Sequence, residues 1–175
     1  MQSGLEGGGD SGRVRRLLDL PPQRLWPEAY RLAAPVSPHW AAEREGITID
    51  RDRLALPAVD GPLVVETAGG LLVPLRRDWL QIDQIAVWGL PVLLVARSGL
   101  GTLNHTLLSL EALARRSIPV LGLVLNGEPH PDNPRTLEEL GGVPVLAELM
   151  PLDPLDRDGL QRQWQRSRLA RSLQP

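Results

Sequence analysis

Four short runs of Val, Leu and Ile, with helical segments between them, constrain the fold of this chain more than any other feature. They cover residues 63–66, 91–96, 119–126 and 144–149, and because they do not alternate with polar residues, both faces of each strand should be buried. Leucines three or four residues apart predict a helix over 102–116. Asn133-Pro134 begins another helix, which Gly141-Gly142 ends. This order predicts an α/β fold with a parallel sheet and right-handed crossovers.

The rest of the chain adds shorter elements to this plan. At 175 residues the chain fits one domain over 1–175 that can bury a real core. Residues 2–12 are mostly Gly, Ser and acidic residues and predict a loop, followed by a short helix over 14–20 that Pro21-Pro22 ends. Ser37 as N-cap and Pro38 as first residue predict a helix over 38–45. The tail over 156–173 predicts a basic, weakly amphipathic helix.

Composition excludes several classes of function. The net charge is −2 with a pI of about 5.9, so no global basic field exists to hold nucleic acid or an anionic membrane. Cysteine is absent, which excludes a disulfide framework and a thiolate metal site. No apolar run approaches the length of a membrane span, and the N-terminus does not resemble a signal peptide, so we expect a cytoplasmic protein. All 19 basic residues are arginine, and lysine is absent.

Candidate site residues lie where the predicted strands end, since ligands of open parallel sheets bind beyond the carboxyl ends of the strands. Glu66, Asn126, the turn over 150–152 and the loop over 97–101 all occupy such positions. Glu66 is the most informative, because a β-branched run delivers one carboxylate into the glycine turn at Gly69-Gly70. A hard cation prefers carboxylate oxygen, and glycine lets a phosphate approach the backbone. The alternative is a charged strand end that faces water.

Several pieces of sequence, in order, resemble the dethiobiotin synthetase family over roughly residues 2–153. They are Gln2-Ser3-Gly4, Asp10, Pro35-Val36-Ser37-Pro38-His39, Glu66-Thr67-Ala68-Gly69-Gly70, Gly99-Leu100-Gly101-Thr102-Leu103-Asn104-His105 and Gly122-Leu123-Val124-Leu125-Asn126. The resemblance implies a P-loop NTPase-like α/β sandwich, a parallel sheet between helices, that acts as a homodimer. It also implies an enzyme of biotin biosynthesis that closes the ureido ring of dethiobiotin from 7,8-diaminononanoate, CO2 and ATP by phosphorylating a carbamate, with Mg²⁺ required.

The same resemblance implies roles for particular residues. Asp10 and Glu66 would bind Mg²⁺, and Ser3, Thr102 and Asn104 would bind the substrate. The nucleotide would be held by Asp10, Glu66, Thr67, Ala68, Gly69, Asn126, Met150, Pro151 and Leu152.

Each of these residues also has a plainer interpretation. Asp10 can be a helix cap, and Ser3 a solvated residue of a terminal loop. Asn126 before glycine can be an ordinary turn, although its amide could also pair with an adenine edge. The turn over 150–152 can simply pack in the core. The free amides of a helix that starts near Gly101 can hold a carboxylate, but a tight turn with Thr102 as its cap explains the glycines equally.

The resemblance further implies that a glycine-rich phosphate loop and a catalytic lysine precede residue 1, so the chain is expected to be an N-terminally truncated synthetase that is inactive alone. Phosphoryl transfer needs positive charge around the phosphate, and an arginine fork does not substitute geometrically for an ammonium. Two other functions stay open at this point. One is a degenerate, non-catalytic nucleotide-fold module, and the other is a domain related to the cobyrinic-acid amide synthases.

Overall fold

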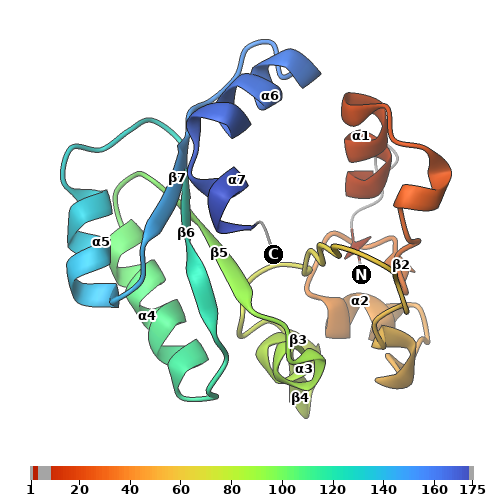
Figure 1. The fold of residues 1–175 in the computed structure, drawn as a ribbon. Coiled ribbons are helices and arrows are strands. Elements are labelled where there is room, and N and C mark those ends of the chain that lie inside the picture. The colour runs from red at the N-terminus through yellow and green to blue at the C-terminus, as the bar shows by residue number, and fades with distance from the viewer. Residues whose placement is uncertain (1, 4–8, 174–175) are drawn as a thin grey trace. The chain divides into compact units, whose positions relative to one another are not determined.

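The computed structural model describes residues 2–3 and 9–173, and the chain divides into two compact units, Met1–Gly89 and Leu90–Pro175 (Figure 1). Each unit has its own apolar core and is described by itself. The sequence-based expectation of one domain over 1–175 stays a prediction. Among the described residues, every helix is too short or too polar to cross a bilayer.

The unit Leu90–Pro175 is built on a three-stranded parallel sheet in the order β5-β6-β7. Its elements are β5 (Val92–Arg97), α4 (Thr102–Ala114), β6 (Val120–Asn126), α5 (Asn133–Gly141) and β7 (Val145–Leu149). The predicted strand–helix order and parallel sheet are confirmed. Each strand begins one residue after a proline, because proline has no N–H to donate to the ladder. The proline carbonyls still pair, as Val92 donates to Pro119 O at 2.8 Å.

Helices α4 and α5 cover one face of this sheet (Figure 1). Leu110 of α4 and Leu137 of α5 pack there against Leu123 and Leu125 of β6, each at most 8% exposed. The opposite face packs Val124 against Leu169 near the C-terminus. Both faces of β6 are therefore buried, as expected. The same expectation is wrong for β5, an edge strand whose Val95 is 60% exposed.

A register shift in the β6–β7 ladder follows Gly122. A Cβ on this glycine would lie 2.6 Å from Leu146 Cγ and 2.7 Å from the carbonyl oxygen of Pro144. Only glycine therefore lets β7 approach β6 this closely. Beyond the shift, Asn126 lies opposite Leu149, so the register fixes which residues meet at the end of the sheet.

The tail is two helices rather than the single one predicted over 156–173. They are α6 (Arg157–Arg166) and α7 (Leu169–Ser172). Ser167 between them is extended, with φ −81° and ψ 160°. The break lets the Arg168 amide donate to Leu146 O of β7 at 2.9 Å and places Leu169 in the core. A continuous helix could do neither. The amphipathic pattern predicted a single helix because it does not register these contacts with β7 and the core.

The unit Met1–Gly89 holds two small sheets and three α-helices among its described residues. Its elements are β1 (Gln2–Ser3), α1 (Gly9–Leu18), a 3₁₀ turn (Pro22–Arg24), β2 (Arg31–Leu32), α2 (Pro38–Arg44), a second 3₁₀ turn (Asp52–Leu54), β3 (Pro74–Arg76), β4 (Trp79–Leu80) and α3 (Gln81–Trp88). Strands β1 and β2 are parallel, and β3 and β4 form a hairpin. Buried residues such as Leu32, Ile49 and Leu75 form the core of this unit. Ser37 and Pro38 begin α2 as predicted, although the Ser37 side chain makes no capping bond.

Two predictions fail in this unit. The loop over 2–12 is wrong, because Gln2–Ser3 is a strand and α1 already begins at Gly9. A tertiary contact overrides the glycine-rich composition here. Ser11 bonds the Glu28 carboxyl, whose pKa is lowered chiefly by a backbone hydrogen bond and further by Ser11 and Arg31. The buried strand over 63–66 is also wrong, since none of the sheets formed by the described residues includes these residues and Val64 is 92% exposed. An apolar run becomes a buried strand only where a neighbouring strand pairs with it.

Candidate functional site

The carboxyl ends of β5, β6 and β7 bring one group of predicted site residues together. Arg97, Asn126 and Leu149 are neighbours across the three strands, and register partners share one face of a sheet. The Gly127 amide donates to Leu149 O at 2.9 Å, which places the following turn beside Asn126. Asn126 is exposed, and its side chain bonds no other described residue. Its amide is therefore free to pair with a ligand.

The turn Met150, Pro151 and Leu152 borders a groove of about 590 Å³ within the same unit. The opposite wall belongs to α6, with Arg162 and Gln163 among its residues. Met150 is 51% exposed and Leu152 is half-buried, so core packing accounts for Leu152 in part and not for Met150. The groove therefore offers an apolar edge at this turn.

The loop after β5 is fixed by the buried residue Ser98, which is 5% exposed. Its amide donates to Asn126 O at 3.2 Å, and its carbonyl accepts from Asn133 Nδ2 at 2.8 Å. Gly127 packs against the same residue, because a Cβ there would lie 2.6 Å from Ser98 Oγ. These contacts join the ends of β5 and β6 to the start of α5.

Thr102 and Asn104, the predicted substrate residues of α4, lie differently. Gly101, with φ 91°, is the N-cap of α4, so the alternative of Thr102 as cap is wrong. Thr102 is buried, its hydroxyl lies 3.3 Å from that of Thr106, and its amide donates to Gly99 O. This geometry gives no support to a substrate contact by the Thr102 side chain. Asn104 is exposed in the first turn and makes no side-chain bond to another described residue.

In the unit Met1–Gly89, Glu66 precedes a turn that α3 holds in place. The Gln81 and Ile82 amides donate to the carbonyls of Val73 and Leu71, and Gln81 Nε2 donates to Gly69 O at 3.3 Å. Gly69 has φ 88°, a conformation that favours glycine. Thr67 and Ala68 are half-buried, and Glu66 is exposed without an ion pair to any described residue. The carboxylate is thus free at the start of an anchored turn.

Asp10 and Ser3 lie in the same unit. Asp10 is exposed in the first turn of α1 and, within the described part of the chain, makes no ion pair. The backbone of Ser3 pairs with Leu32 in the β1–β2 ladder, but its side chain lies outside the described residues. Its proposed role stays a prediction.

Over the residues that the structure describes, no group of three or more His, Asp or Glu side chains is arranged to hold a metal ion. A magnesium ion is often held by one or two carboxylates together with waters and substrate phosphates. The exposed carboxylates of Asp10 and Glu66, which pair with no other described residue, are chemically suited to such a site, in which waters and phosphates complete the coordination of the ion. They are not suited to a site made of protein ligands alone.

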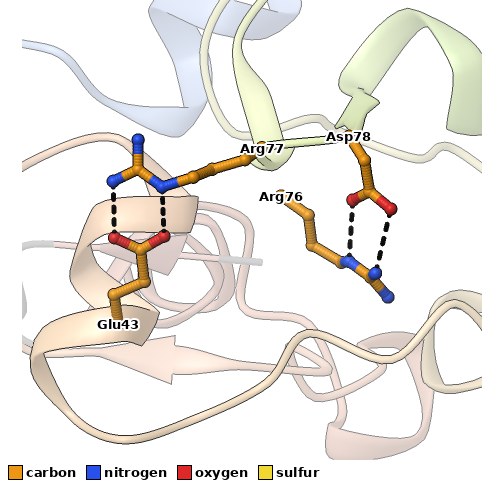
Figure 2. A network of polar contacts seen from close by, with 4 residues as sticks. All are labelled: Glu43, Arg76, Arg77 and Asp78. Atoms are coloured by element: carbon orange, nitrogen blue, oxygen red, sulfur yellow. Dashed lines mark hydrogen bonds and ion pairs between the residues drawn. The ribbon is translucent and has the colours of Figure 1, made fainter.

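Two ion pairs of this unit are separate from these carboxylates. Figure 2 shows the Arg77 guanidinium facing the Glu43 carboxylate through two hydrogen bonds of 2.8 Å, with Arg76 and Asp78 paired beside them at 3.0 Å. The hydrogen bonds from Arg77 lower the pKa of Glu43. Both pairs are exposed; the Arg77–Glu43 pair joins α2 to the β3–β4 turn, and the Arg76–Asp78 pair lies within that turn, so both are structural contacts.

Comparisons with known proteins identify the family. Residues 1–158 match a family described as an AAA domain. The chain is 51% identical over 167 residues to the ATP-dependent dethiobiotin synthetase BioD of Rhodopseudomonas palustris (strain BisB18), a match over 95% of this chain and 80% of that protein. The chain belongs to the dethiobiotin synthetase family. It is also 51% identical over 162 residues to the protein of that name from Brucella anthropi, over 93% of this chain and 76% of the relative.

A further relative is the biotin biosynthesis bifunctional protein BioCD of Bordetella avium (strain 197N), 54% identical over 157 residues, which are 89% of this chain and 34% of that protein. Membership of the synthetase family makes this chain a ligase of biotin biosynthesis that forms a ring and uses ATP as co-substrate. The predicted α/β fold of the P-loop NTPase type is likewise confirmed.

Sequence reasoning missed the residues that fix the candidate segments within each unit. They are Gln81 in the unit Met1–Gly89, and Ser98, Asn133 and Gln163 in the unit Leu90–Pro175. A polar residue whose hydrogen-bond partner lies 12 or more positions away carries no local signal of that partner. The one clue was the position of Asn133 next to the proline that starts a helix, where an asparagine can bond back to a preceding loop.

Proposed function

We propose that this chain, in the protein expressed from its complete reading frame, serves the ATP- and Mg²⁺-dependent carboxylation and ring closure of 7,8-diaminononanoate with CO2. One substrate amine attacks CO2 and loses a proton, which gives a carbamate. The carbamate oxygen takes the γ-phosphoryl group of ATP, and ADP leaves. The second amine then attacks the carbonyl carbon and expels phosphate, which closes the ureido ring. The observation that carries the proposal is the free Glu66 carboxylate at the start of an anchored glycine turn, in a chain of this family.

The described residues support distinct roles in this reaction. In the unit Leu90–Pro175, the Asn126 amide would pair with the adenine edge, and the turn Met150 to Leu152 would bracket the ring. Asn104, at the exposed start of α4, would bind the substrate carboxylate together with first-turn amides. Ser3 would hold the substrate as well.

The unit Met1–Gly89 would supply the acidic ligands. Glu66 and Asp10 would hold Mg²⁺ through their carboxylates, and the backbone of Thr67, Ala68 and Gly69 would approach the phosphates. When bound, the cation stabilises the negative charge that develops on the transferred phosphoryl group. The protein would act as a homodimer with the substrate bound across the interface.

The test is Glu66→Gln in the protein expressed from its complete reading frame. The substitution keeps the size and hydrogen bonding of the side chain but removes the charge, so turnover should fall by orders of magnitude while the melting temperature barely changes. Asp60→Asn, at another exposed carboxylate of the same unit, is the matched control and should keep wild-type turnover. Wild-type activity of Glu66→Gln across a Mg²⁺ titration would make Glu66 an ordinary surface residue.

One observation favours a second candidate, a nucleotide-fold module without catalysis. The 175 residues contain no lysine, and phosphoryl transfer draws on compact positive charge at the phosphate. We therefore expect the 175-residue chain, assayed by itself, to form no ADP with diaminononanoate and CO2. Substrate-dependent ADP formation by the purified, cooperatively melting chain would contradict both this expectation and the second candidate.

A further inference from the structure

Helix α6 contacts the turn Met150 to Leu152 at two points along the groove that both segments line. Gln163 Nε2 donates to the carbonyl oxygen of Met150 at 2.6 Å. About one turn earlier, Gly159 is buried against Leu152, since a Cβ on Gly159 would lie 3.1 Å from Leu152 Cδ1. The Asp156 carboxylate caps the helix by accepting from the Gly159 amide at 2.7 Å.

These contacts lie at three- and four-residue steps along one face of α6. Later residues of the tail contact earlier residues of the segment over 146–152, so the tail from Gly159 to Arg168 runs back along β7 and the turn after it: Gly159 lies at Leu152, Gln163 at Met150 and Arg168 at Leu146. Gln163 bonds the backbone of the turn and leaves the Met150 side chain exposed at the groove. The turn is therefore fixed without covering the surface that would meet a ligand.

We propose that Gln163 is a positioning residue for the nucleotide, which it serves by fixing the Met150 carbonyl and hence the apolar bracket for the base. This proposal rests on the proposed nucleotide role of Met150 to Leu152. Gln163 lies beyond residue 158, where the match to the AAA domain family ends. The tail helix thereby becomes part of the nucleotide site through its contact with the turn, although Gln163 itself touches no reacting atom.

Gln163→Met tests the proposal, because methionine matches the length of glutamine and cannot donate the hydrogen bond. In the protein expressed from its complete reading frame, KM for ATP should rise about two- to tenfold, the effect of one lost hydrogen bond. The KM for diaminononanoate and kcat should stay at their wild-type values. Gln161→Met is the matched control, since Gln161 is exposed on the same helix and bonds no other described residue, and its KM for ATP should not change.

A change that is not selective would overturn the proposal. If Gln163→Met raises both KM values equally, or lowers only the melting temperature, then Gln163 merely stabilises the tail. An unchanged KM for ATP would also overturn it. Gly159→Ala places a methyl group against Leu152 and gives an independent test if Gln163→Met folds poorly. It should raise the KM for ATP and leave the KM for diaminononanoate unchanged.

Leu152→Ala in the same assay separates this proposal from the proposed function. If Leu152→Ala raises the KM for ATP and Gln163→Met does not, the bracket is right and the positioning role of Gln163 is wrong. If neither variant, nor Met150→Ala, changes the KM for ATP, the nucleotide role of the turn is wrong.

Discussion

Replacing Asn133 by alanine should destabilise the chain, although the residue is polar and lies at the start of a helix. Its side chain is 6% exposed, and Nδ2 donates to the carbonyl of Ser98 at 2.8 Å. Asn133→Ala would leave that carbonyl, which belongs to a residue only 5% exposed, without this donor. An unsatisfied buried acceptor costs about 1–3 kcal/mol. For a chain of this length, about 2–4 °C is lost per kcal/mol, so the melting temperature should fall by roughly 2–12 °C.

Asn126→Ala is the matched control for this prediction. Both residues are asparagines near the strand ends, but Asn126 is exposed and its side chain bonds no other described residue. Its removal should change the free energy of unfolding by at most about 0.5 kcal/mol. Scanning calorimetry of the two variants beside the wild type makes the comparison. The reasoning is refuted if Asn133→Ala melts with the wild-type chain, or if the two alanine variants lose the same stability.

Two further stability predictions use a glycine pair and an ion pair. Gly122→Ala would press a methyl group onto Leu146 and the Pro144 carbonyl, which should lower the free energy of unfolding by about 1–3 kcal/mol. Gly99→Ala is the control, because it has open space around its Cβ and should not destabilise the chain. Equal denaturation midpoints for the two variants would contradict this prediction. Because Arg77 lowers the pKa of Glu43, this pair stabilises the fold above the ordinary glutamate pKa of about 4.3, and the contribution is lost as the pH falls through the lowered value. At low salt, the melting temperature of Glu43→Gln should therefore fall less on acidification than that of the wild type. If the melting temperatures of the two proteins fall in parallel as the pH is lowered, this role of the Arg77–Glu43 pair is refuted.

The sheet of the unit Leu90–Pro175 was predictable because its signals are local. Prolines and glycines bound the apolar runs, and the leucine spacing of α4 shows in one helix length of sequence. The strand over 63–66 failed for the converse reason. An apolar run predicts a buried strand only on the assumption that a partner strand lies beside it, and pairing is not a local property.

In the candidate site too, features with a local signal could be predicted from the sequence and features that depend on distant contacts could not. The positions of Asn126 and the turn over 150–152 follow from the rule that parallel strands end together. The residues that fix them do not, because Gln163 bonds a carbonyl 13 residues away and Asn133 one 35 residues away. Helix periodicity marks these residues only as polar. The sequence therefore reveals which residues could meet a ligand better than which residues hold them in place.

Sharing of the site between subunits can be tested with two inactive variants. Asn104 is exposed at the start of α4, Leu108 lies one turn further on the same face at 55% exposure, and Leu100 in the preceding loop is fully exposed. Large exposed apolar side chains around a proposed substrate residue are typical of an interaction surface, which supports a two-fold interface there. Asn104→Ala should weaken diaminononanoate binding and leave ATP binding unchanged.

If Asn104 reaches the site of the partner subunit, a mixed dimer of Glu66→Gln and Asn104→Ala subunits holds one site with both defects and one with neither. With random mixing, half the dimers are mixed and half their sites are intact, so about a quarter of wild-type activity should return. The variants are unfolded and refolded together, with wild type carried through the same treatment. No gain of activity, with wild type recovered, would mean that Asn104 acts within its own subunit or has no part in the reaction. A return near one quarter requires Glu66 and Asn104 to serve one site from different chains. If both residues served the site of their own chain, every site in a mixed dimer would carry one defect and no activity would return.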